Sequence, residues 1–209
     1  MSSRNTAEII QLPPTAVSKR VETVKRVRAA VEKKTRYLLE GLSSNVADAL
    51  FEEMHHLSEE DALACHFNIM RCLKTQGDVL ANEFAQYMDK SWVNLVHRRD
   101  KQAIADASQD VTPMLKAYSD KYLNHYKILL EELRLRFCHL SRRRLAFHPM
   151  LPGNFYLCFW HATEDLDLTY QERKLLLPLF HRFVMDRFGQ VLAISNQTLV
   201  ELEIPAWFE

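Results

Sequence analysis

Glycine is scarce in this chain, and the scarcity argues against several kinds of site. The 209 residues include only four glycines, at positions 41, 77, 153 and 189. Loops that cradle a phosphate group use closely spaced glycines, and turn-rich β architecture uses many more of them. The chain therefore lacks the usual means of holding a nucleotide or inorganic phosphate through backbone amides.

Excess charge of one sign and long apolar runs are also missing. Lysine plus arginine equals aspartate plus glutamate at 27 each, so no net charge attracts nucleic acid or a membrane. No stretch approaches the roughly 18 apolar residues of a membrane span. The first residues lack the layout of a secretory signal, and the four cysteines are scattered. We therefore expect a cytoplasmic protein with reduced thiols, no membrane span and no cofactor.

The apolar residues that are present recur with a helical period. They make up 47% of the chain, which is enough for a sizeable core. No window alternates as a strand does, so the sequence predicts an all-α helical bundle of about seven or eight helices with no sheet. Gly41 and Gly77 are expected to end helices. Thr169 and Glu172 predict a capping box. The expected helices cover 15–41, 44–57, 58–76, 79–96, 113–140, 153–161, 169–188 and 191–202.

Polar stretches predict how the chain is divided. Residues 1–14 are polar, close with two prolines and predict a flexible N-terminal arm. Residues 15–96 predict an N-terminal helical subdomain, and the polar residues 97–112 predict a linker. Residues 113–209 then form a C-terminal helical subdomain, which we expect to pack on the first.

Charge is segregated along the first third of the chain. Between Val17 and Glu40 eight basic residues stand against three acidic ones, whereas residues 43–64 hold six acidic residues and no lysine or arginine. The basic face either binds a phosphate backbone, an anionic lipid or an acidic partner, or is simply solvated. The acidic segment can dock on the basic helix within the molecule or between copies. Arg28 lies near the centre of the apolar stripe, so it must snorkel, pair with an acid or bind a ligand.

Two further groups of residues are candidates for contact with a partner. A second basic cluster lies at the end of the helix expected over 113–140, where cations also favour the helix C-terminus, and it consists of Arg134, Arg136, Arg142, Arg143 and Arg144. Aromatic residues crowd the segment from Phe147 to Trp160 and the tail. They either form the core between the last helices or present an exposed patch. The tail 204–209 either folds back onto the bundle or serves as a docking peptide.

Metal-ligating patterns are present but incomplete. Glu52-x-x-His55 and Glu53-x-x-His56 have the spacing of ligands on one helical face. A di-metal site needs a second such motif, and Cys158-x-x-His161 lacks the two further ligands that zinc requires. No serine or cysteine has an assigned base. We therefore predict no catalytic or metal site, and the roles of His55, His56, His148 and His161 stay open.

Two blocks of the chain resemble a known family. The first runs from Arg26 to about Leu95 and includes Ala49-Leu50-Phe51-Glu52. The second runs from His148-Pro149 through Asn196-Gln197-Thr198-Leu199 to Glu203-Ile204-Pro205. Together they are similar to a family of bacterial proteins known mainly as a domain of unknown function, of which this chain resembles a short version. Some long members carry the label thymidine phosphorylase, which a glycine-poor helical chain does not fit. The resemblance implies no catalytic residues.

The leading hypothesis is a non-enzymatic adaptor or regulator that binds a protein partner or a second copy of itself. The alternative is a nucleic-acid-binding regulator that uses the basic helix 17–40 and Arg142 to Arg144. A metal-binding helical protein is a third reading. The expected interaction surface consists of Arg20, Lys25, Arg26, Arg28, Lys33, Arg36, Arg142, Arg143, Arg144, Phe155, Tyr156, Trp160, Trp207 and Phe208.

Overall fold

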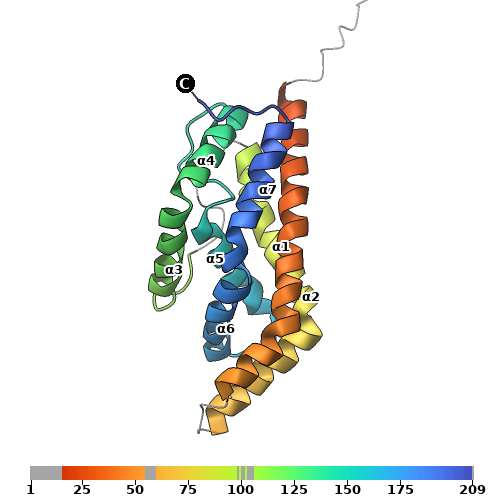
Figure 1. Ribbon diagram of the computed structural model, residues 1–209, viewed down its shortest axis with the longest axis vertical. Coiled ribbons are helices and arrows are strands. Elements are labelled where there is room, and N and C mark those ends of the chain that lie inside the picture. The colour runs from red at the N-terminus through yellow and green to blue at the C-terminus, as the bar shows by residue number, and fades with distance from the viewer. Residues whose placement is uncertain (1–15, 55–59, 98, 100–101, 103–105, 209) are drawn as a thin grey trace, which may run out of the picture.

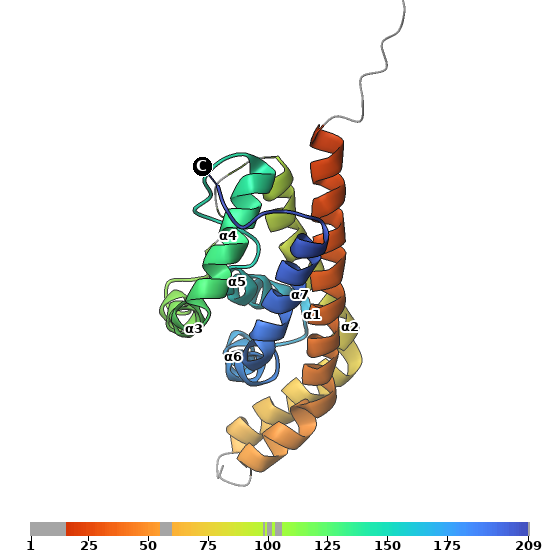
Figure 2. The same ribbon diagram turned by 45° about the horizontal axis from the view of Figure 1, so that its top comes forward.

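The first two helices form a long hairpin, and the remaining helices pack against one side of it (Figures 1 and 2). The computed structural model describes residues 16–54, 60–97, 99, 102 and 106–208. Within these residues there are seven α-helices, two short 3₁₀ turns and no strand, which confirms the all-α prediction. The α-helices are α1 (Ala16–Met54), α2 (Glu60–Val96), α3 (Thr112–His125), α4 (Lys127–Ser141), α5 (Pro152–Ala162), α6 (Tyr170–Phe183) and α7 (Phe188–Glu201), and the turns are η1 (Thr163–Asp165) and η2 (Met185–Arg187).

α1 is a single helix of 39 residues, so the prediction that Gly41 ends a helix was wrong. Gly41 has no positive φ, and it lies inside the helix. The apolar stripe continues across it, because Leu38, Leu42 and Val46 are all buried. Glycine inside a helix costs about 1 kcal/mol relative to alanine, a cost that burial of the neighbouring leucines exceeds.

α2 was predicted as two helices separated at Gly77, and it is one helix with a kink. Gln76 has φ −121° and ψ 16°, which is not helical. Its side-chain amide donates to Asp167 Oδ2 over 2.7 Å, and its carbonyl accepts from Asp167 N over 3.0 Å. A Cβ on Gly77 would lie 2.7 Å from Ser43 Oγ. Gly77 therefore permits the close approach of α2 to α1 rather than ending a helix.

The helix predicted over 113–140 divides at Tyr126, where φ is −105° and ψ is 23°. The predicted start of the helix over 169–188 is correct. Thr169 accepts a hydrogen bond from Glu172 N and Glu172 accepts one from Thr169 N, which is the expected capping box at the start of α6. That helix ends at Phe183, earlier than expected, and η2 leads from it into α7.

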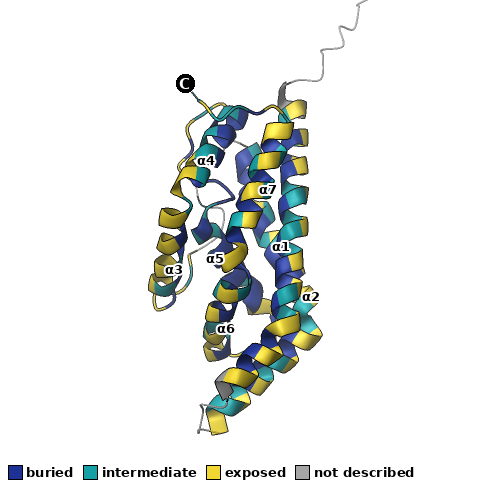
Figure 3. Ribbon diagram, in the orientation of Figure 1, coloured by how far each residue is buried: buried dark blue, intermediate teal, exposed yellow. Residues whose placement is uncertain are grey.

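The core is continuous from α1 to the C-terminal tail. α5 lies inside it, with Phe155, Tyr156 and Phe159 fully buried. Buried positions face inward from the helices around α5, whereas exposed positions recur along the outer side of α1 and α3 (Figure 3). In the part of the chain that the structure describes, no helix has the length and apolar character to cross a membrane. The division into subdomains at 97–112 stays a prediction.

Candidate interaction surface

The basic segment and the first part of the acidic segment belong to one helix, α1, which bends toward its hairpin end (Figures 1 and 2). A helix of 39 residues is about 58 Å long. It runs from one end of the molecule to the other, and the hairpin end reaches beyond the remaining helices (Figures 1 and 2). Its N-terminal half exposes Lys25, Arg26 and Lys33, and the half nearer the hairpin end exposes Asp48 and Glu52. α1 is therefore mainly positive along one half of its exposed face, where Glu22 is also exposed, and negative along the other.

Two of the predicted basic residues hold the hairpin together. Arg28 Nε lies 2.6 Å from Asp89 Oδ1 on α2, and both side chains are half-buried. Of the three alternatives for Arg28, pairing with an acid is the one the structure shows. Burial raises the pKa of Asp89, and the positive charge of Arg28 acts against that rise. Arg36 Nη2 donates to Asn82 Oδ1 over 2.7 Å. These contacts connect α1 to α2, while Arg20 is half-buried near the start of α1.

The acidic part of α1 cannot fold back onto the basic half of α1, because both belong to one continuous helix. Of the two ways in which the acidic segment could dock on the basic helix, docking between molecules is the one that remains. Phe51 and Phe67 are 57% and 56% exposed at the same end of the hairpin. Within the chain, Glu52 Oε2 lies 3.9 Å from Arg182 Nη2 in an exposed pair, and such pairs contribute little to stability.

The second basic cluster ends α4. Arg142 has φ 53° and forms the left-handed C-cap of that helix, so part of its role is structural. Arg142 and Arg144 are exposed, and Arg143 is half-buried. The C-terminal end of α4 and the N-terminal end of α1 lie at the same end of the molecule (Figures 1 and 2). The two basic clusters therefore share one end of the protein, opposite the acidic end of the hairpin.

Three aromatic residues of the predicted surface belong to the core. Phe155 and Tyr156 are fully buried, and Trp160 is 3% exposed, so they cannot form an exposed patch in this fold. The apolar character of α5 all round reflects its position inside the bundle. Phe208 is partly buried against the core, whereas Trp207 is 58% exposed beside His139. Of the predicted aromatic surface, Trp207 is the residue that remains accessible.

The C-terminal tail folds back onto the bundle through Arg136, which the sequence assigned only to a basic cluster at a helix end. Arg136 is 9% exposed. Its Nε donates to Asn196 Oδ1 over 2.8 Å, its Nη2 donates to Glu132 Oε1 over 2.7 Å, and its Nη1 donates to the carbonyl of Ile204. The hydrogen bonds from Arg136 and then Asn196 lower the pKa of Glu132. One guanidinium thus connects α4, α7 and the tail, and an arginine within the apolar stripe of α4 was the available signal.

Replacing Arg136 by methionine is expected to lower the free energy of unfolding by about 2–3 kcal/mol, because the buried carbonyl of Ile204 and the half-buried carboxylate of Glu132 lose their donor. The tail should also become accessible, which increases the rate of proteolytic cleavage after residue 202. Arg144→Met is the matched control, since Arg144 is exposed. Its change should stay within about 0.5 kcal/mol. Equal effects of the two substitutions in denaturant unfolding would contradict the role given to Arg136.

A polar cluster around His181 joins α3, α5 and α6 and was also missed by the sequence reading. Tyr156 Oη lies 2.8 Å from His181 Nδ1, and Lys121 Nζ lies 3.2 Å from Nε2. Tyr122 donates to Asp186 Oδ1 over 2.8 Å. Burial, and then the charge of Lys121, lower the pKa of His181, while burial raises the pKa of Tyr156. The groups are engaged with one another across helices, an arrangement that aligns α3, α5 and α6.

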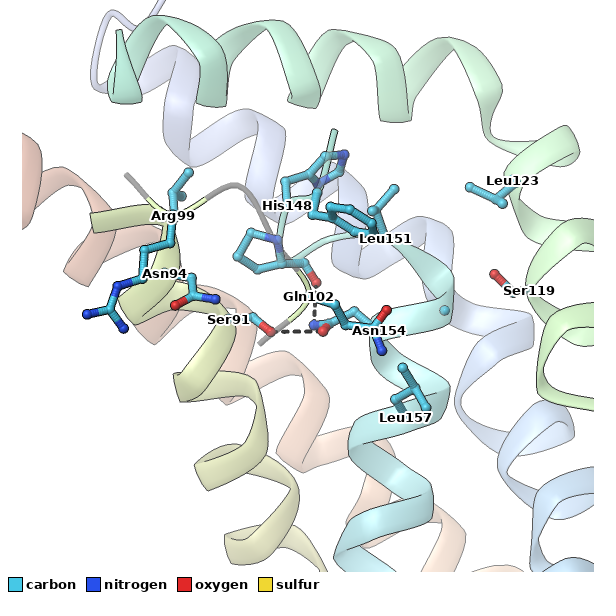
Figure 4. Close-up of a pocket in the computed structure, with 14 residues that line it drawn as sticks. Ser91, Asn94, Arg99, Gln102, Ser119, Leu123, His148, Leu151, Asn154 and Leu157 are labelled. Carbon is cyan, nitrogen blue, oxygen red and sulfur yellow. Dashed lines mark hydrogen bonds between the residues drawn. The ribbon is translucent and has the colours of Figure 1, made fainter. Parts of the chain in front are cut away.

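A cavity of roughly 170 Å³ lies between α2, α3 and the start of α5 (Figure 4). Ser91 donates to Asn154 Oδ1 over 2.8 Å at its wall, and Ser119 and Leu123 line it from α3. His148 also lines it and is 6% exposed, and among the described residues no group forms a hydrogen bond with its Nδ1. Burial, and then the charge of Arg134, lower the pKa of His148 to about 3. The cavity is smaller than most ligand sites, and it is lined mainly by apolar groups.

The described residues of the metal motifs have other contacts. His55 and His56 lie outside the described residues. His161 Nδ1 lies 3.1 Å from Glu164 Oε1, and its ring stacks on Tyr87 at 5.4 Å. Cys158 is fully buried, which raises the pKa of its thiol and disfavours the thiolate that binds metals. Among the residues that the structure describes, no three side chains of the metal-ligating types form a group.

Comparison with protein families gives one match. Residues 20–202 match the family described as Protein of unknown function (DUF1631) N-terminal domain. The chain belongs to this family. The matched region contains α2 to α7 entirely and most of α1, so the match covers the helical bundle described above. No curated protein and no solved structure matches this chain.

Proposed function

We propose that this DUF1631 domain is a non-enzymatic cytoplasmic protein that acts by binding another protein chain, as an adaptor or regulator. The observation that carries the proposal is the division of charge along the exposed face of α1. A surface that is positive at one end and negative at the other selects both the partner and its orientation. Exposed Phe51, Phe67 and Trp207 supply apolar contacts of the kind that stabilise such complexes.

The arrangement of the polar side chains also supports a binding role. The buried polar groups around Arg136 and His181 are hydrogen-bonded to other helices of the same bundle. Ser91 and Asn154 at the cavity wall form a hydrogen bond with each other. A catalytic centre needs a nucleophile or acid–base pair aimed at a space that a substrate can enter. The groups named here are instead used to align helices.

Affinity purification of the full-length chain from cells tests the proposal. The intact chain should recover a stoichiometric protein, either a second copy or a different chain. Arg26→Glu combined with Lys33→Glu should lose it, because both residues are exposed on α1. Lys74→Glu combined with Lys116→Glu makes the same charge change at exposed positions on other helices and should retain it. Failure of the intact chain to recover any stoichiometric protein would refute the proposal.

The second candidate function is binding of a nucleic acid. It is favoured by the position of Arg142 and Arg144 at the same end of the molecule as the basic half of α1 (Figures 1 and 2). This reading requires an affinity that falls steeply as salt is raised. It also requires that Arg142→Gln with Arg144→Gln weakens the complex. A gel-shift assay at low salt with no retarded band would eliminate it.

A further inference from the structure

The exposed face of α1 carries four charges to which the described part of the chain supplies no partner. Arg26, Lys33, Glu40 and Asp48 are all exposed. Within the part of the chain that the structure describes, none of the four makes an ion pair or a side-chain hydrogen bond. At about 100° per residue they lie within roughly 80° of the helix circumference, so they form the central part of one stripe, to which exposed Lys19 and Glu22 add one charge of each sign nearer the N-terminus. We name these four residues and Tyr37, which lies between them, the α1 stripe.

The order of charges in the α1 stripe is self-complementary. Two positive residues are followed by two negative ones. The midpoint between Lys33 and Glu40 and the midpoint between Arg26 and Asp48 both fall within one residue of Tyr37. A two-fold axis near Tyr37 therefore sets Lys33 of each copy beside Glu40 of the other, and Arg26 of each copy beside Asp48 of the other. A parallel arrangement would instead set like charges side by side.

The centre of the stripe suits contact between two identical helices. Tyr37 is 66% exposed, the second-highest value among the large apolar side chains of the described residues. Beside it, Gly41, Ser44 and Asn45 border a hollow of roughly 410 Å³ that Phe183 and Arg187 close on the other side. A Cβ on Gly41 would meet nothing within 4 Å, so the surface there is open. A two-fold axis repeats each contact, so the ring of one copy can meet the hollow of the other copy twice in one dimer.

From this self-complementarity we propose that the occupant of the α1 stripe is a second copy of this chain, bound with its α1 antiparallel. This inference rests on the proposed function and names its partner. The ion pairs span about 33 Å of helix between Arg26 and Asp48, which fixes the direction of the two helices. The acidic end of each hairpin then lies against the basic half of the other molecule. The two-fold arrangement closes on itself and yields a dimer rather than a chain of molecules.

Charge exchange in the purified full-length chain tests the dimer. Sedimentation velocity at low salt should give twice the chain mass of 24.5 kDa for the natural sequence. The variant Arg26→Glu/Lys33→Glu makes the stripe wholly negative, and the variant Glu40→Lys/Asp48→Lys makes it wholly positive. Each alone should dimerise about tenfold more weakly or worse, because every ion pair becomes a like-charge contact. An equimolar mixture of the two variants should recover the dimer.

Several results would overturn the dimer. One is a monomeric mass for the natural sequence at every salt concentration. The occupant of the stripe would then be residues 1–15 or a different protein. A second is that both variants dimerise with the same affinity as the natural chain. A third is that the mixture of the two variants stays monomeric. Circular dichroism should show unchanged helix content in both variants, since all four residues are exposed. If the natural chain is monomeric but affinity purification recovers a different protein, the antiparallel dimer is wrong and the proposed function still stands.

Discussion

Replacing Phe155 by alanine is expected to lower the free energy of unfolding by about 3–5 kcal/mol. Phe155 is fully buried in α5, and its ring centroid lies 5.8 Å from that of Phe84 on α2 and 4.9 Å from that of Phe188 on α7. Truncation removes these contacts and leaves a cavity where three helices meet. Denaturant unfolding followed by circular dichroism measures the change.

Trp207→Ala is the matched control for that experiment. Trp207 is an aromatic residue of similar size, but it is 58% exposed in the tail. Its loss should change the free energy of unfolding by about 0.5 kcal/mol or less. If Trp207→Ala costs as much as Phe155→Ala, the assignment of the α5 aromatics to the core and of Trp207 to the surface is wrong.

Acid is expected to destabilise the bundle through His148. Its pKa in the folded state is about 3, below the ordinary value of 6.5, so the unfolded chain binds the extra proton. The stability from neutral His148 is fully present above pH 6.5 and is lost as the pH falls toward 3. Between these values the slope is about 1.4 kcal/mol per pH unit, which gives roughly 3 kcal/mol at pH 4.5. His181, whose pKa is also lowered, contributes in the same direction.

The contribution of His148 is isolated by substitution. The free energy of unfolding of the natural chain and of His148→Leu is measured at pH 7.5, 5.5 and 4.5. The difference between the two should change in favour of the leucine variant as the pH falls, by about 1.4 kcal/mol per unit below 6.5. His125→Leu, at a residue exposed on α3, serves as the control. Parallel pH profiles for the natural chain and His148→Leu would show that His148 is protonated in the folded protein without cost.

Local signals in the sequence predicted the fold class and some of the boundaries. The capping box of Thr169 and Glu172 depends on residues three apart, so it can be recognised without knowledge of the fold. The helix end expected at Gly41 depended on propensity alone. The apolar face of α1, opposite the α1 stripe, packs against the core across Gly41, and this packing overrode the propensity. The break at Tyr126 has no glycine or proline signal. Tyr126 packs its ring on Phe188, a contact that the sequence cannot show.

The site was only partly predictable for the same reason. The sequence identified Arg28 as a residue in need of a partner, but Asp89 lies on another helix. The charge segregation was visible in the sequence, whereas its extension along one helix became clear only when Gly41 proved helical. The aromatic residues of α5 had two readings, because composition does not distinguish a central helix from an exposed one. Burial in the folded chain decided between them.

The central claim is that a protein covers the exposed face of α1 in the working state. Carbodiimide crosslinking joins a lysine directly to a carboxylate, so it reports on Lys33 and Glu40 without a spacer. The measurement mixes ¹⁵N-labelled and unlabelled full-length chains at low salt and identifies crosslinked peptides by mass spectrometry. The account predicts Lys33–Glu40 crosslinks that contain one labelled and one unlabelled peptide. Crosslinks at these residues that form only within one chain, in the purified protein and in cell extract alike, would contradict it.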